Sequence, residues 1–130
     1  MFTHVMVGTN DIEISKKYYD AVLGALNIPP GVFGSETRCF YRSPIGSFAI
    51  TKPINGEKAT PANGGTIGFV AKSEEQLHAF HAIGIANGGA ACEDPPGQRL
   101  GPLGPYFIAY LRDPDGNKIC ALYRPTNPQS

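Results

Sequence analysis

The sequence has no excess of either charge. Eleven basic and eleven acidic residues cancel, and no basic run is interleaved with aromatic residues. A neutral chain has no electrostatic reason to bind nucleic acid or an anionic membrane surface. We therefore expect neither of them as a partner.

Long apolar runs and paired cysteines are also missing. No run approaches the roughly 20 residues of a membrane-spanning helix, and the N-terminal MFTHVMVGTND lacks the basic start of a secretory signal. The three cysteines, Cys39, Cys92 and Cys120, are widely spaced and form no C-x-x-C pair, so neither a disulfide framework nor a structural zinc site is predicted. Free thiols in a chain without a signal predict a cytoplasmic protein.

Several catalytic motifs are absent. The chain contains no G-x-S-x-G elbow, no H-E-x-x-H pair and no dinucleotide-binding fingerprint. The segment GQRLG around Arg99 is not a phosphate loop, because it lacks the G-K-[ST] ending and a following helix. Arg99 instead lies in a Gly/Pro-rich loop, where a cation is well placed to cap a pocket and meet an anionic substrate.

What is present indicates one globular domain. The chain has 130 residues, of which 42% are hydrophobic and 17% charged, and this is enough to bury a core. Sixteen glycines and twelve prolines favour a sheet-rich fold with short strands and many turns. The predicted order in the first part is a strand at 2–8, a helix, a loop-like stretch to Gly34 and a hairpin at 37–53. The helix is expected to begin at Asn10, which has a capping-box partner in Glu13.

The same order then begins again after a polar linker. Residues 66–71 predict a strand, and a helix follows in which Ser73 and Gln76 have capping-box spacing. Residues 90–105 are expected to form at most one short strand and then a loop, before a second hairpin at 106–125.

These two halves form an internal repeat. The pattern R-x-P-x-G occurs at Arg42 and again at Arg112, an offset of 70, while the fronts of the two halves align at an offset of 62. Two copies of this length indicate a duplicated module. The predicted fold is therefore α+β, with two tandem βαβββ modules in one domain. Module one covers about 2–53, the linker covers 54–65, and module two covers about 66–124.

The two modules, the opening THVMVGTNDIEISKKYYDAVLGAL and the closing DPDGNKI together resemble the vicinal oxygen chelate superfamily. This group includes glyoxalase I, bleomycin-resistance proteins and extradiol dioxygenases. The resemblance covers nearly the whole chain. It implies two half-barrels around a cleft that often holds one divalent metal, with closure across a dimer, so we expect a homodimer.

The resemblance also implies where a metal would bind. Glyoxalase-like members use His, Glu, His and Glu, and the matching positions here are His4, Ile50, Thr66 and Cys120. A catalytic divalent metal takes about three protein ligands and an open position, and only His4 survives from the usual set. We therefore expect no metal cofactor. The alternative is a non-standard site for Zn, Ni, Mn or Fe that uses His4 and Cys120.

The predicted ligand pocket combines these positions with residues from neighbouring strands. Its members are His4, Phe48, Ile50, Thr66, Cys120, Tyr106 and Arg99. His4 is the best candidate for a catalytic residue, and Cys120 is expected to be a buried thiol rather than a nucleophile. Strand alternation places Tyr106 and Tyr110 on one face and Phe107 on the other, without showing which face lines the cleft.

Two functions follow from this pattern. The preferred one is a metal-free glyoxalase-family protein that binds a small molecule in a largely apolar cleft, for sequestration, sensing or transport. The neutral charge balance gives no support to a large cationic drug as that ligand. The alternative is an enzyme similar to lactoylglutathione lyase, to an isomerase or to a dioxygenase, with a non-standard metal site or acid-base chemistry through His4 and Cys120. It is the weaker choice because the usual base and Lewis acid, which supply much of the rate, are missing.

Overall fold

The computed structural model describes residues 1–125, which contain two helices and nine strands. The helices are α1 (Ile12–Gly24) and α2 (Glu74–Ala86). The strands are β1 (His4–Gly8), β2 (Val32–Ser35), β3 (Arg38–Ser43), β4 (Gly46–Thr51), β5 (Ile67–Val70), β6 (Ala90–Ala91), β7 (Gly97–Gly101), β8 (Gly104–Arg112) and β9 (Lys118–Tyr123). This α+β architecture confirms the predicted fold class, and its sheets do not close into a barrel. Within residues 1–125, neither helix has the length and apolar character needed to cross a membrane.

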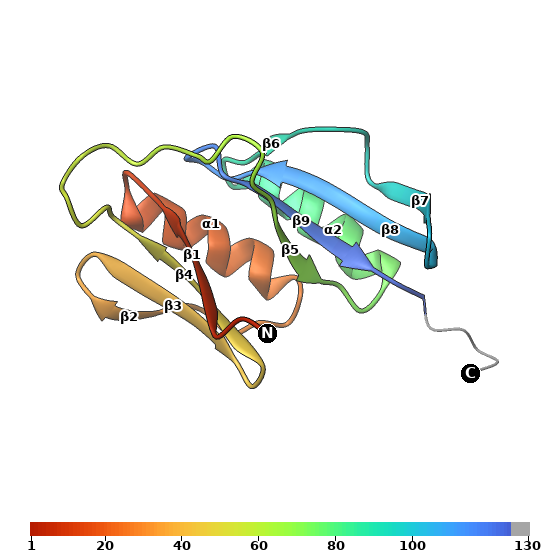
Figure 1. The fold of residues 1–130 in the computed structure, drawn as a ribbon, viewed down its shortest axis with the longest axis horizontal. Helices are drawn as coiled ribbons and strands as arrows, with labels where there is room; N and C mark the ends of the chain where they lie inside the picture. Colours follow the sequence, from red (N-terminus) through yellow and green to blue (C-terminus); the bar gives the residue numbers. More distant parts are fainter. Residues whose placement is uncertain (126–130) are drawn as a thin grey trace.

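The strands form two sheets of related topology (Figure 1). The first has the order β1-β4-β3-β2, and the second has the order β5-β9-β8, with β6 and β7 both pairing with β8. In each sheet the first strand runs parallel to the last one, β1 beside β4 and β5 beside β9. The repeat seen in the sequence is therefore a repeat of strand pairing.

Two segments expected as loops are strands. Val32–Ser35 forms β2 at the edge of the first sheet, and Gly97–Gly101 forms β7 in a hairpin with β8. The glycines and prolines around β7 had suggested a flexible loop. Gly104, with φ of 103°, instead makes the tight turn that joins the two strands.

The helix starts depend on capping side chains. Asp11, and not Asn10, caps α1, because its carboxylate accepts hydrogen bonds from the backbone N–H groups of Glu13 and Ile14, both at 3.1 Å. Asn10 instead pairs its amide with the backbone of Ala59 in the linker. Ser73 caps α2 as predicted, accepting a 3.0 Å hydrogen bond from the N–H of Gln76.

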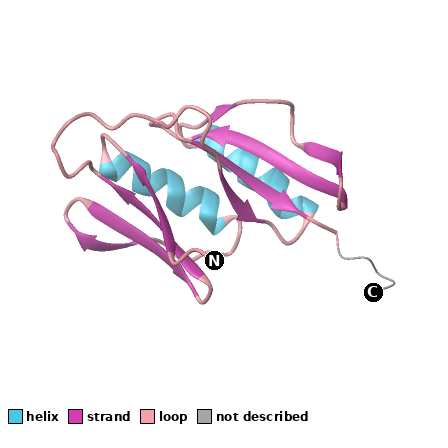
Figure 2. Cartoon of the chain, in the orientation of Figure 1, coloured by secondary structure: helices cyan, strands magenta, loops and turns pink. Residues whose placement is uncertain are grey.

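Both helices lie on the same side of the two sheets and contact each other (Figure 2). The core between them and the strands is apolar and aromatic. Its fully buried members include Tyr18, Tyr19, Val22, Leu23, Leu77, Phe80, Leu111 and Ile119. Gly84 allows the close approach of α2, since a Cβ there would clash with Leu111 and lie 3.3 Å from Val22 Cγ1.

The turn between β8 and β9 joins the second half of the chain to the first. Asp113 is buried there and accepts a 2.6 Å hydrogen bond from the hydroxyl of Tyr19 on α1. Asn117 donates its amide to the carbonyl of Gly8 at 2.9 Å. Asp115 accepts a 2.8 Å bond from the N–H of Asn10. The D-P-D-G segment is thus a structural connection between the two halves, as well as a turn.

Candidate functional site

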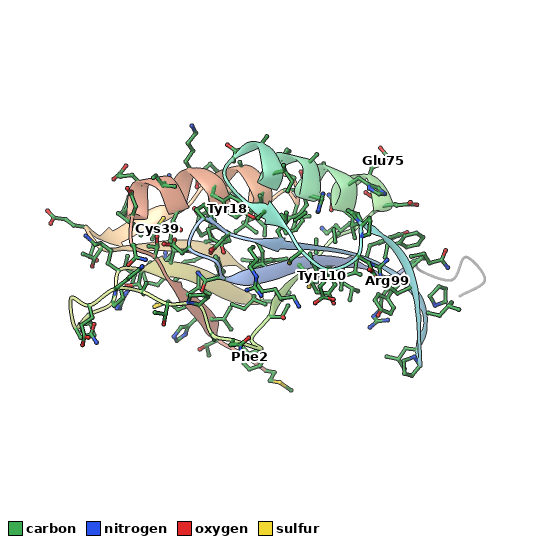
Figure 3. The ribbon with its side chains drawn as sticks, turned by 90° about the horizontal axis from the view of Figure 1, so that it is seen from above. Phe2, Tyr18, Cys39, Glu75, Arg99 and Tyr110 are labelled. Atoms are coloured by element: carbon green, nitrogen blue, oxygen red, sulfur yellow. The ribbon has the colours of Figure 1, made fainter. Side chains whose placement is uncertain are left out.

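The two faces of the sheets are different. In β9, Ile119 and Ala121 point into the core under the helices, so alternation places Lys118, Cys120 and Leu122 on the opposite side. We call this side, which no helix covers, the open face. In Figure 3, Tyr18 and Cys39 lie between the helices and the strands, whereas Tyr110 and Arg99 lie on the side away from the helices.

Register across the strands determines which predicted residues reach the open face. Tyr110 pairs with Cys120, and Arg99 on β7 pairs with Tyr106. Phe107 pairs with Tyr123 and packs against the core. The open face therefore carries Tyr106 and Tyr110, and the core face carries Phe107.

Phe48 and Ile50 are corrections to the predicted pocket. They are 5% and 0% exposed and belong to the core beneath the helices, so they do not face His4 or Cys120. The turn at 113–117 is one residue longer than the turn at 43–46. Arg42 pairs with Ser47, five residues on, whereas Arg112 pairs with Lys118, six residues on. The offset after the hairpin turn is therefore 71, and the counterpart of Cys120 is Ala49.

His4 is exposed at the start of β1, where it is paired with Ser47 on β4. Its Nδ1 lies 2.9 Å from the hydroxyl of Thr3. Thr66, its predicted repeat partner, is exposed just before β5. Both positions are open to solvent in the single chain.

Cys120 lies on the open face and is nevertheless only 6% exposed. It sits between Tyr110 and Gly68, and its Sγ would be 3.2 Å from a Cβ at Gly68. Burial raises the pKa of this thiol to about 11, against a smaller opposing effect from the positive charge of Lys118. Cys120 is therefore a neutral thiol at pH 7 in the metal-free chain, which does not suit a nucleophile.

An ion pair covers this part of the open face. Lys118 forms a salt bridge and hydrogen bond with Glu93, and its Nζ lies 4.9 Å from the centre of the Tyr110 ring. Burial raises the pKa of Tyr110, with a smaller contribution from Cys120, so its hydroxyl stays protonated near pH 7. No sequence motif pointed to Glu93. For Lys118, the spacing of two residues from Cys120 along one strand predicts that the two side chains share a face, as they do here.

The family's metal positions do not offer a suitable donor set. They are His4, Ala49, Thr66 and Cys120, which amount to one imidazole, a methyl group, a neutral hydroxyl and one thiol, so at most His4 and Cys120 could bind a metal. Divalent metals of this chemistry take imidazole, carboxylate or thiolate ligands, and about three of them. Residues 1–125 contain no cluster of three His, Cys, Asp or Glu side chains that could hold a metal ion.

Comparison with known proteins agrees with the fold and the strand pairing. The chain matches the Glyoxalase/Bleomycin resistance protein/Dioxygenase superfamily over residues 1–121. The chain belongs to this superfamily. No curated protein matches the sequence significantly.

Solved structures extend this relationship. A glyoxalase/bleomycin resistance protein from Albidiferax ferrireducens T118 is 65% identical, with a TM-score of 0.92, over 95% of this chain and 99% of that chain. A glyoxalase-related enzyme from Fulvimarina pelagi has a TM-score of 0.73 at 19% identity, covering 98% of this chain and 93% of that one. A lactoylglutathione lyase from Agrobacterium tumefaciens has a TM-score of 0.65 at 17% identity, covering 95% and 92%. The last two share the fold with this chain.

Proposed function

We propose that this chain binds a small organic molecule on its open face without a divalent metal. The observation that supports this function is the donor set at the family's metal positions, which retains a single imidazole at His4. The same face keeps features of a binding surface. Val70 is 73% exposed on it, and half-buried Leu122 lies beside Val70, with buried Ile108 on the next strand.

We also propose that a second copy of the chain closes this face. Two hollows on the surface of the single chain lie elsewhere, one beside α1 and one beside the β2–β3 turn, and neither is lined by His4, Tyr106 or Cys120. On the open face, Val70 is exposed and would be covered by a partner. Sedimentation analysis should give twice the 13.9 kDa chain mass. A monomer at micromolar concentration would contradict closure by a second copy.

A cytoplasmic location is part of the same proposal. Cys39, Cys92 and Cys120 are free thiols, as expected for a protein kept in a reducing compartment.

The function can be tested by a ligand screen on EDTA-treated protein. A compound that binds only the folded chain raises its melting temperature, and the shift should be the same with and without added Zn²⁺, Ni²⁺ or Mn²⁺. Val70→Asp should abolish the shift, because it places a carboxylate beside the apolar side chain of Leu122. Ile54→Asp is the matched control, since Ile54 is 96% exposed in the linker and away from the open face.

Two results would contradict the proposal. One is a ligand that binds only after a divalent metal has been added. The other is a set of ligands whose binding is unaffected by Val70→Asp.

A further inference from the structure

The charges of this neutral chain are distributed unequally between its strands and the rest of the molecule. None of the 11 acidic residues lies within a strand, since all of them are in helices, turns and loops. Five cations lie within strands, namely Arg38, Arg42, Arg99, Arg112 and Lys118. Register and alternation place all five on the open face, opposite the buried core positions.

All five arginines of the chain belong to this face, because Arg124 follows β9 directly and its guanidinium lies 5.4 Å from the ring centre of Tyr106. None of the arginines forms a salt bridge with another residue of the 1–125 segment, whereas Lys118 is neutralised by Glu93. An anionic group bound on the open face would therefore contact guanidinium groups that have no salt bridge within residues 1–125.

Two of these arginines flank one tyrosine in the same cross-strand row. Arg99 on β7 is the register partner of Tyr106, and Arg124, which follows β9, has its guanidinium 5.4 Å from the centre of the Tyr106 ring. The guanidinium of Arg99 is held by the backbone carbonyls of Asp94 and Pro95, at 3.4 and 3.0 Å. These contacts fix its position without neutralising its charge.

The next row of the open face is apolar. Ile108 lies two residues after Tyr106 on β8, and Leu122 lies two residues before Arg124 at the end of β9. Ile108 pairs with Leu122, and Leu122 pairs with Val70. A ligand that places an acidic group between Arg99 and Arg124 would thus lay its body on exposed Val70 and half-buried Leu122, beside buried Ile108. Guanidinium groups bind carboxylates and phosphates in a planar, bidentate manner, and they tolerate contact with aromatic rings.

We propose that the ligand of the open face is an organic anion with a flat apolar body, whose acidic group binds between Arg99 and Arg124. This inference rests on the proposed function, since it names the ligand class of the same face. It also argues against a cationic ligand, which the arginines of the open face would repel.

The test uses three probes of one shape: 2-naphthoate, 2-naphthamide and 2-naphthylmethylammonium. Calorimetric titration of the intact, EDTA-treated protein should give at least tenfold tighter binding of the anion than of the other two. Acetate, which has the charge without the body, should bind at least tenfold more weakly than 2-naphthoate.

Single-charge variants locate the site. Arg124→Gln and Arg99→Gln should each weaken 2-naphthoate binding about fivefold or more and leave 2-naphthamide unchanged. Arg99→Lys, which keeps the charge, should recover part of the loss. Lys17→Gln is the matched control, because it removes one exposed cation from the helix side of the molecule and should have no effect.

Equal affinities for the three probes would overturn the inference. So would an affinity for 2-naphthoate that is the same in the wild type, Arg99→Gln and Arg124→Gln. Tighter binding of a single-stranded oligonucleotide through the same arginines would overturn it too. The proposed function can fail separately from this inference. If a neutral ligand binds, loses its binding in Val70→Asp and is unaffected by both arginine variants, the proposed function holds and the inference fails. If any ligand requires a metal, the proposed function itself fails.

Discussion

The covered face of the sheets carries Cys39, Ile50, Leu111 and Ile119 with no exposed surface, whereas the open face carries every cation found within a strand. The same strands supply both faces, because alternate residues point to opposite sides. Apolar burial beneath the helices stabilises the fold, and the open face is left free to vary in charge and shape. We therefore expect substitutions on the covered face to change stability and those on the open face to change binding.

The largest effect is expected at the contact between α2 and β8. Leu111→Ala removes a fully buried side chain and should lower the free energy of unfolding by about 2–5 kcal/mol. Chemical denaturation measures this directly. Leu100→Ala, at a leucine that is 84% exposed on β7, should change it by less than about 0.5 kcal/mol.

Gly84 sharpens this prediction, because its missing side chain leaves the space that Leu111 fills. Gly84→Ala alone should cost about 1–3 kcal/mol by overpacking. In the Leu111→Ala background the same change should cost less, since the clashing group has gone. Strict additivity of the two changes would contradict the contact.

A smaller effect is expected from two adjacent tyrosines that differ in one hydrogen bond. Tyr19→Phe removes the donor to buried Asp113 and should cost about 1–3 kcal/mol. Tyr18→Phe removes a buried hydroxyl that has no partner among residues 1–125, and it should be neutral or slightly stabilising. If thermal or chemical unfolding shows equal losses of stability in the two variants, the hydrogen bond from Tyr19 to Asp113 does not stabilise the fold.

The cysteines test whether the open face is uniformly accessible. Burial raises the pKa of Cys120 to about 11, so the thiolate is scarce at neutral pH and its share grows about tenfold per pH unit below that value. Mass spectrometry after iodoacetamide treatment at pH 7.5 should show half-buried Cys92 modified first, with Cys39 and Cys120 protected. Rapid labelling of Cys120 at this pH would contradict its burial beneath Tyr110 and Lys118.

The smallest effect on stability is expected from the open-face arginines. Arg124 is exposed and has no salt bridge in the 1–125 segment. Arg124→Gln should therefore change the free energy of unfolding by less than about 0.5 kcal/mol. Paired measurements of unfolding and of 2-naphthoate binding on this one variant separate the two faces. A loss of stability above 1 kcal/mol would mean that the arginine supports the fold.

The sequence alone predicted both helices, the two hairpins and the two halves, but not β2 and β7, because helical stripes and turn residues are local signals. It could not fix which face of a strand is covered, since a shift of one residue reverses every side chain. That shift, caused by the longer turn at 113–117, put Ile50 in the predicted pocket in place of Ala49. The placement of Arg99 and Arg124 on the two sides of Tyr106 in one cross-strand row also escaped prediction, because it depends on β7, whose glycines suggested a loop.

Metal content tests the central claim most directly. Purified protein should be incubated with Zn²⁺, Ni²⁺, Mn²⁺ and Fe²⁺ in turn, passed through gel filtration and analysed by mass spectrometry for bound metal. We predict far less than one equivalent per chain, with no difference between the wild type and His4→Ala. One equivalent of any of these metals, retained by the wild type and lost in His4→Ala, would contradict binding without a metal.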